Sequence, residues 1–401
     1  MKASSMKDGN SFATMFFERG FRPFFLAAGI YSFLAMAVWL ALIQGWVGLE
    51  PDMPPAYWHA HEMLFGYTGA AVAGFFLTAV PTWAGAPPVA GARLAALFFL
   101  WLAARISPWL APAVPAALVA GLDVAFFPAL AWLILPALKL GKSRRSFIFP
   151  PILVAMALGN LLFHLESLGI ADGIAGHGLT LMVDCMALLI GVIGGRVTSS
   201  FTANVLKAQG AEAQVRSFPP LDRLALASLL ALLIVDLVLD SSHVAGVVAL
   251  AAALLNGLRL SFWQGIKTLR KPILLVLHLG YGWLVVGLAL KGLALLSDVI
   301  SPADAVHGIT VGAIGTMTIA IMTRASLGHT GRPLRAGLTM SAAYVMVSLA
   351  ALARVGIPFL GLDAFDTALW LSSGLWIAAF GLFSILFFPI LTSSRVVAGP
   401  A

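Results

Sequence analysis

Residues 24–46 read FFLAAGIYSFLAMAVWLALIQGW, a run without Asp, Glu, Lys or Arg. About 20 such residues are enough to span a bilayer as an α-helix. Of the 401 residues, 60% are hydrophobic and only 10% are charged, whereas a soluble domain carries about 25% charged residues. Most side chains must therefore face lipid or one another. Because backbone groups in lipid must be satisfied within the segment, each such run is expected to be helical.

Eleven further apolar runs follow, separated by polar or Pro/Gly-rich breaks. The sequence thus predicts an all-α, polytopic membrane bundle of about twelve helices that forms a single integral membrane domain over residues 1–401. The longest polar stretch, at about 196–222, is expected to be the loop between the sixth and seventh spans. The predicted spans are 24–46, 62–80, 92–108, 113–138, 147–168, 175–195, 221–240, 244–262, 272–296, 305–323, 336–355 and 366–391.

The lysines and arginines predict the orientation of these spans. Loops on the cytoplasmic side of a membrane are enriched in both residues. With the N-terminus placed inside, all 24 lysines and arginines fall on the inner side except Arg105, Lys291 and Arg354. A missed or merged span would destroy this alternation downstream. We therefore expect a multi-pass protein of the bacterial inner (plasma) membrane, with both termini cytoplasmic, and interpret the net charge of +7 as an orientation signal, not as a nucleic-acid site.

Histidines gather near the predicted outer face. Neutral imidazoles ligate haem iron or copper, and metal ligands in helix bundles come from facing helices at matching depth. His59, His61 and His307 satisfy this depth condition and are expected to form one outer metal centre, with His278 as an axial haem ligand or part of a second centre. The alternative is that the three outer histidines are interfacial side chains reaching for water. The histidines that fall near this face are His59, His61, His164, His177, His243 and His307.

The spacing of His59 and His61 leaves two arrangements open. On a regular helix, residues two apart face roughly opposite ways. Both can reach one metal only if the helix starts between them; otherwise each serves a different centre. Glu62, next in the chain, is a candidate to orient an imidazole or to complement the helix dipole.

Other polar residues lie within or beside the apolar runs, where ionisable groups are expensive and usually functional. His278 is about two turns inside the ninth span, and Asp123 and Asp184 could form part of a proton path or bond neighbouring helices. Arg105 lies between Trp101 and Trp109 and could hold a haem propionate or an outer carboxylate. Arg196 and Arg324 follow the sixth and tenth spans, and the stretch 324–332 (RASLGHTGR) could form an anion nest or a tight loop.

Several motifs resemble the NnrS family. They are RGFRPFFL at 19–26, WHAHEMLFG at 58–66, GFFLTAVPTW at 74–83, GGRVTSSFTAN at 194–204 and MTRASLGHTGRPL at 322–334. The resemblance runs from about residue 16 to about 335. It implies a twelve-span inner-membrane protein that contains haem and copper and takes part in bacterial defence against nitric oxide. It also implies the best metal ligands, which are His59, His61, His278, His307 and His329, with His164, His177 and His243 ranked lower.

Three function classes stay open at this point. The first is a haem- and copper-binding protein that limits nitrosative damage, for which a lipid-facing bundle suits a small apolar gas such as nitric oxide. The second is a membrane redox enzyme that turns over nitric oxide and needs an electron donor. The third is a metal-free transporter, which would need discontinuous helices and a polar site at mid-membrane.

Overall fold

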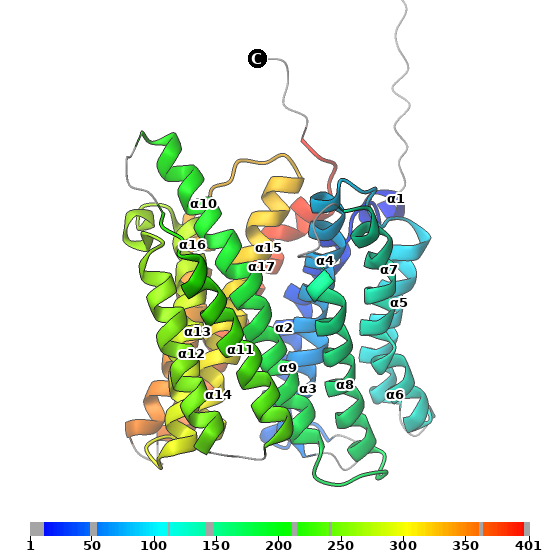
Figure 1. Ribbon diagram of the computed structural model, residues 1–401. Coiled ribbons are helices and arrows are strands. Elements are labelled where there is room, and N and C mark those ends of the chain that lie inside the picture. Colours follow the sequence, from blue (N-terminus) through cyan, green and yellow to red (C-terminus); the bar gives the residue numbers. More distant parts are fainter. Residues whose placement is uncertain are drawn as a thin grey trace, which may run out of the picture.

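The helices of this protein stand side by side as a bundle (Figure 1). The computed structural model describes residues 12–48, 54–110, 113–141, 147–210, 215–239, 243–360 and 364–396. Over these ranges the chain contains helices and connecting segments but no strand.

The first half of the bundle comprises the helices α1 (Phe12–Phe16), α2 (Phe21–Ile43), α3 (Pro55–His61), η1 (Glu62–Thr68), α4 (Gly69–Ala84), α5 (Ala92–Ile106), η2 (Ser107–Leu110), α6 (Ala116–Val124), α7 (Phe126–Leu140), α8 (Phe149–Ser167), α9 (Ala175–Leu189), η4 (Ile190–Gly194) and α10 (Gly195–Ala208). The second half comprises α11 (Pro219–Val238), α12 (His243–Ser261), η5 (Gly265–Thr268), α13 (Pro272–Leu296), α14 (Pro302–His307), η6 (Gly308–Gly315), α15 (Thr316–His329), α16 (Leu338–Gly356), η7 (Ile357–Leu360) and α17 (Phe365–Leu391).

The number of long apolar helices confirms the predicted membrane bundle. Among the described residues, 11 continuous helices are long and apolar enough to cross a membrane. The predicted seventh span corresponds to α11, which is 20 residues long but contains Asp222, Arg223 and Asp236. With α11 counted, the described residues have a helix at the position of each of the twelve predicted spans, 11 of which are candidates to cross a membrane.

Three spans form the inside of the bundle. They are the second (α3–η1–α4), the sixth (α9–η4–α10) and the tenth (α14–η6–α15). In an apolar 18-residue stretch of each, 83%, 78% and 78% of the residues are buried, whereas this share does not exceed 56% in the other apolar spans. Each contains a π-helical segment, η1, η4 or η6. Such segments are rare and often mark functional positions. Small residues let the neighbouring helices approach closely: a Cβ added to Gly308 would lie 2.8 Å from the Cα of Gly287 on α13.

These inner spans are longer than the hydropathy pattern predicts. The second begins at Pro55 and the tenth ends at His329. The expectation of a loop from residue 196 is wrong over its first part, which forms helix α10. Its hydroxyls bond to carbonyls one turn back, Ser199 to Gly195 at 2.8 Å and Thr202 to Thr198 at 2.8 Å, so polar side chains are accommodated in a helix.

The first and last spans lie side by side at the end of the bundle that carries α1 (Figure 1). The Arg22 guanidinium on α2 donates to the backbone oxygens of Leu391, at 2.9 Å, and Ser393, at 2.7 Å. We call this the α1 end; the opposite one, which carries α3, α6 and α14, is the α3 end and was predicted to face outward. Which side each end faces stays a prediction, because the termini and the cations Lys2, Lys7, Lys142, Arg144 and Arg145 lie outside the described residues.

Candidate functional site

A cluster of ionisable side chains is buried near the α3 end. We call it the buried cluster, and each of its members is at most 7% exposed. It joins the second to fifth spans, because its side chains come from α3, η1, α5, α6 and α8. Its members are His61, Glu62, Arg105, Asp123, Asn160 and His164.

Glu62 is held by donors on three sides. It accepts hydrogen bonds from the Arg105 guanidinium at 2.6 Å, from Nδ1 of His61 at 2.9 Å and from the hydroxyl of Tyr31 on α2. The first turn of η1 leaves room for this arrangement because residue 66 is glycine. A Cβ there would lie 2.7 Å from the Tyr31 ring and 3.0 Å from a Glu62 carboxylate oxygen.

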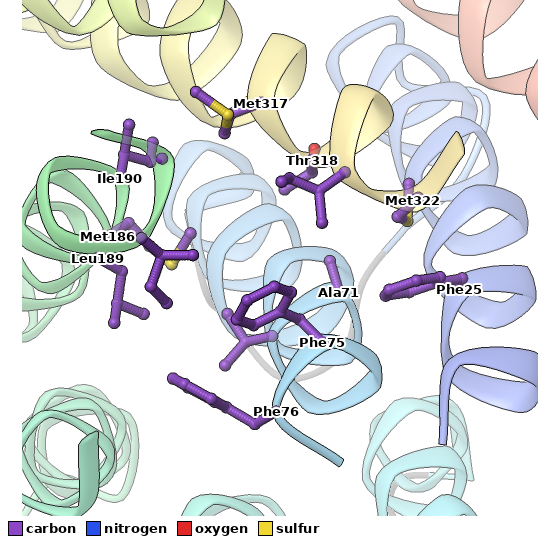
Figure 2. A pocket seen from close by; sticks show the side chains of 14 residues that line it. Phe25, Ala71, Phe75, Phe76, Met186, Leu189, Ile190, Met317, Thr318 and Met322 are labelled. Carbon is purple, nitrogen blue, oxygen red and sulfur yellow. The ribbon is translucent and has the colours of Figure 1, made fainter. Parts of the chain in front are cut away.

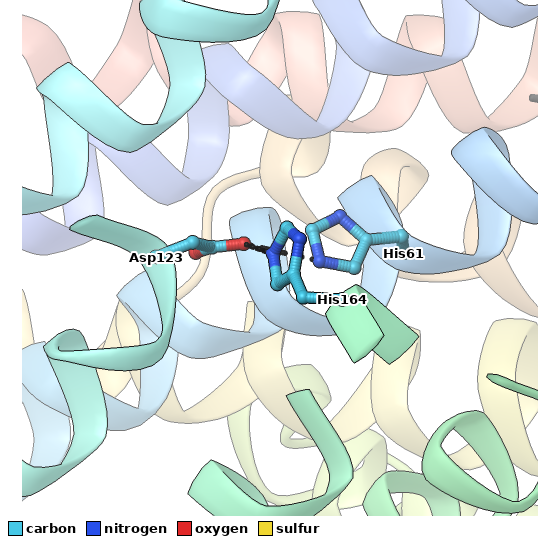
Figure 3. A group of neighbouring side chains, drawn as sticks. All are labelled: His61, Asp123 and His164. Carbon is cyan, nitrogen blue, oxygen red and sulfur yellow. Dashed lines mark hydrogen bonds and ion pairs between the residues drawn. The ribbon is translucent and has the colours of Figure 1, made fainter. Parts of the chain in front are cut away.

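Asp123 is the second carboxylate of the buried cluster. One of its oxygens accepts from the Arg105 guanidinium. The other, Oδ2, lies 3.0 Å from Nε2 of His164 and 3.1 Å from Nε2 of His61 (Figure 3). The same His61 nitrogen lies 3.0 Å from Oδ1 of Asn160.

Two imidazoles and a carboxylate thus converge from three spans. The ligand atoms of His61, Asp123 and His164 all lie within 4.8 Å of one another. The rings of Phe163 and Phe65 close off the His61 side, with centroids 4.2 Å and 5.1 Å from that of His61. The set has the chemistry of a small metal site.

A large cavity of about 1060 Å³ also opens at the α3 end. Ligand cavities in proteins usually measure about 300–1,000 Å³, so this one has room for a bulky ligand. Its walls mix apolar side chains with imidazoles and cations. The residues that carry these polar groups are His59, His177, His307, Lys291, Arg354 and Asp236.

His59 and His307 line this large cavity from different spans. The ring of His59 stacks on Trp39, with centroids 4.7 Å apart, and its Nδ1 is buried without a hydrogen-bond partner. Nδ1 of His307 donates to the carbonyl of Ala303 at 2.6 Å. A neutral His307 therefore keeps Nε2 as an acceptor, which is the tautomer that a metal ligand needs. The two imidazoles and Arg354 lie near enough to interact electrostatically.

The structure does not bring together all three histidines of the expected outer centre. His59 and His307 line the large cavity, whereas His61 points into the buried cluster. The two-residue spacing of His59 and His61 inside α3 is the physical reason, because a continuous helix begins at Pro55 and turns these side chains to different sides. Each imidazole thus belongs to a different candidate centre.

The three predicted outer cations are each paired with a carboxylate. Arg105 bonds to both acids of the buried cluster and does not line the large cavity. Lys291 bonds to Asp184 at 2.8 Å and to Asp236 at 2.5 Å. Arg354 pairs with Asp304 at the start of α14. Of these three cations, Lys291 and Arg354 line the large cavity, and Arg105 does not.

The remaining predicted site residues lie toward the α1 end. Nε2 of His278 lies 2.9 Å from the Thr202 hydroxyl, and its Nδ1 is buried without a partner. His329 stacks on Phe21, with centroids 5.6 Å apart.

The two arginines expected to bind anions lie over aromatic rings. Arg196 lies 5.6 Å from the Trp83 ring, and Arg324 lies 3.7 Å from the Phe201 ring. Helix α15 runs from Thr316 to His329, so most of 324–332 is helical and does not form the expected nest or loop.

Sequence reasoning missed part of the site. His164 and His177 were ranked below the motif histidines, yet one lies in the buried cluster and the other lines the large cavity. Asn160 was not singled out. It precedes His164 by one helical turn, so both side chains share a face of α8. A polar pair at this spacing in an apolar span was the available signal.

A second, small cavity of about 70 Å³ lies between the inner spans (Figure 2). Its lining is almost entirely apolar, with rings from α2 and α4 and methionines from α9 and α15. Apolar walls of this kind suit apolar guests. The residues labelled in its walls include Phe25, Phe75, Phe76, Met186, Met317 and Met322.

The fold and these sites define a polytopic helical membrane protein with convergent imidazoles near one end of the bundle. The family model described as NnrS protein matches residues 15–395. The chain therefore belongs to the NnrS family. No curated protein matches the chain significantly.

Proposed function

We propose that this protein is a haem- and copper-binding protein of the bacterial inner membrane that protects the cell against nitric oxide. The family supports this function, since the chain matches the NnrS family over nearly its whole length. One structural observation carries the proposal further. The large cavity places two imidazoles, His59 and His307, beside the cations Lys291 and Arg354.

The residues of the large cavity fit a haem. Its apolar walls suit a macrocycle. Arg354, which pairs with Asp304, is the cation that suits a propionate, whereas Lys291 is already held between two carboxylates. His307 has its Nδ1 hydrogen fixed on a backbone oxygen, and His59 keeps a buried ring nitrogen without a partner. These are the residues that would hold the group. A haem bound there would supply iron, which can bind nitric oxide as a ligand.

Copper is the second metal of the proposal. Imidazole is a good copper ligand, and imidazoles occur both at the large cavity and in the buried cluster.

The small cavity suits the gas. Nitric oxide is small and apolar, so it partitions into hydrocarbon and can reach the bundle laterally through lipid. The small cavity has apolar walls and lies among the same inner spans that carry His59 and His307.

The visible spectrum of the purified protein tests this proposal. A Soret band, together with copper by metal analysis, is expected. His307→Ala should lower the Soret absorbance per chain, and His243→Ala, at the start of α12 and outside both candidate centres, should not.

Two outcomes would contradict the proposal. A wild-type preparation without a Soret band would favour a metal-free transporter. Equal haem content in both variants would show that His307 does not bind the haem. Adding nitric oxide under reducing conditions then separates binding from turnover, since an enzyme supplied with electrons consumes more than one equivalent.

A further inference from the structure

The buried cluster lacks one positive charge. Its two carboxylates, Glu62 and Asp123, share a single guanidinium, Arg105, so one negative charge remains when both imidazoles are neutral. All three groups are at most 4% exposed. Burying an uncompensated charge is strongly unfavourable, so the cluster is expected to hold one more cation.

The hydrogen bonds show where that cation belongs. Glu62 accepts from Nδ1 of His61, so this nitrogen carries the hydrogen, and the lone pair of a neutral His61 lies on Nε2. That lone pair faces two oxygens, Oδ2 of Asp123 at 3.1 Å and Oδ1 of Asn160 at 3.0 Å. Turning the Asn160 amide would offer Nε2 a donor, but the carboxylate would still face the same lone pair and the charge would still be missing.

A proton or a metal ion could fill this position, and the donors favour a metal. The set consists of two imidazole nitrogens and one carboxylate oxygen, a combination found at open transition-metal sites. Glu62 accepts a hydrogen bond from Nδ1 of His61. Many metal-bound histidines donate to a carboxylate in this way, and the hydrogen bond fixes their tautomer. His164, on another span, brings a second imidazole to the same carboxylate. A proton on His61 could supply the missing charge without this second imidazole, whereas a metal ion would use it as a ligand.

The distances between the ligand atoms suit a metal ion once the side chains shift. Metal–ligand bonds of about 2.0–2.2 Å place tetrahedral ligands roughly 3.3–3.6 Å apart. The nitrogen–oxygen separations in the cluster are 3.0 Å and 3.1 Å. Each nitrogen–oxygen pair must therefore move apart by a few tenths of an ångström, and the two imidazole nitrogens, which lie within 4.8 Å of each other, must approach to about the same spacing. The side-chain oxygen of Asn160 lies next to His61 and could serve as the fourth ligand of the ion.

We propose that His61, His164 and Asp123 bind one first-row transition-metal ion of the kind that prefers imidazole, namely copper, iron or zinc. This second centre is separate from the large cavity and rests on contacts that require no haem. If the ion is copper, it gives the copper of the proposed function a location. Its donor set contains no sulfur, so the methionines of the small cavity have no part in it.

Metal analysis of the purified full chain tests this assignment. Wild-type protein is dialysed against a chelator, reloaded separately with copper, iron or zinc, and assayed for metal and haem per chain. We expect one bound ion beyond the haem iron. His164→Ala should weaken its binding by more than the ~10-fold loss typical of removing an outer partner of a metal ligand.

Matched variants separate loss of the ion from loss of the fold. His177→Ala removes a histidine that lines the large cavity but is not in the buried cluster, and it should keep the ion. Asp123→Asn keeps the size of the side chain and removes its charge, and it should lose the ion while the protein elutes as wild type on size exclusion. X-ray absorption of the loaded wild type should show imidazole scattering that decreases in His164→Ala.

The results distinguish this inference from the proposed function. If the protein binds the ion but no haem, this inference is supported and the haem proposal is refuted. A wild-type chain that takes up none of the three metals, or a His164→Ala variant that binds them as tightly, overturns the inference and leaves a protonated His61 as the missing cation.

Discussion

The hydroxyl groups of Tyr67 and Thr318 share a hydrogen bond, and the two residues line different cavities. Tyr67 lines the large cavity and Thr318 the small one. The Tyr67 ring also packs edge-on against Trp376 and Phe380, with centroids 5.7 Å and 5.3 Å away. The pair thus stands between the apolar inside of the bundle and the cavity proposed to hold haem.

Tyr67→Ala should connect the two cavities. Removing the ring should speed the association of nitric oxide with reduced haem several-fold, which flash photolysis would measure in the Soret band. It should also destabilise the fold by about 3–5 kcal/mol, the usual cost of a deleted core aromatic side chain. Tyr67→Phe keeps the ring and should leave the association rate unchanged. Equal rates in both variants would show that gas does not pass this position.

Arg105→Gln should be among the most destabilising single substitutions in the first half of the chain. It leaves Glu62 and Asp123 buried together without their shared guanidinium, and breaking a buried ion pair costs about 3–5 kcal/mol. The matched control is Arg196→Gln, because Arg196 is exposed and contacts the Trp83 ring, a contact worth about 0.5–1 kcal/mol. Thermal unfolding in detergent at one fixed scan rate compares the two, and similar midpoints would argue against an ionised cluster.

Gly66→Ala should disturb the buried cluster through packing alone. The added Cβ would lie 2.7 Å from the Tyr31 ring and 3.2 Å from the Arg105 guanidinium. Such overpacking costs about 1–3 kcal/mol. At Gly374 on α17 a Cβ meets nothing within 4 Å, so Gly374→Ala should be neutral or stabilising by up to ~1 kcal/mol. A tolerated Gly66→Ala would mean that Tyr31 and Glu62 can separate without loss.

Cysteine labelling checks the predicted orientation. Ala113 and Lys267 are exposed at opposite ends of the bundle, and the native Cys185 is fully buried. A membrane-impermeant maleimide should therefore label Ala113→Cys in intact cells but label Lys267→Cys only after permeabilisation. The unsubstituted chain is the background control. The reverse pattern would invert the orientation and place the buried cluster near the cytoplasm.

Hydropathy and charge were sufficient to predict the bundle, because lipid forces each apolar run into a helix. The cations that do not follow the charge alternation could be explained only from the structure. Arg105, Lys291 and Arg354 break the charge alternation, and each has a carboxylate partner. Lys291 and Asp184 are more than a hundred residues apart in the chain, and hydropathy cannot pair residues over such a distance.

The candidate site was only partly predictable for the same reason. Motifs drew attention to His59, His61 and His307, and the spacing of the first two left open whether they share one metal or serve different centres. Which partners they meet depends on how the spans pack. His164 contacts His61 from another helix, and no local sequence pattern predicts that contact. The π-helical segments were equally invisible, since hydropathy does not distinguish them from α-helix.

The buried cluster and its Tyr31 contact draw one side chain or more from each of the first five spans. Glu62, Arg105 and Asp123 all precede His164 in the chain. The set cannot close until the fifth span is in place. The buried cluster is therefore a lock on the order of assembly of the first five spans: a chain truncated before His164 would leave Asp123 without one of its polar partners.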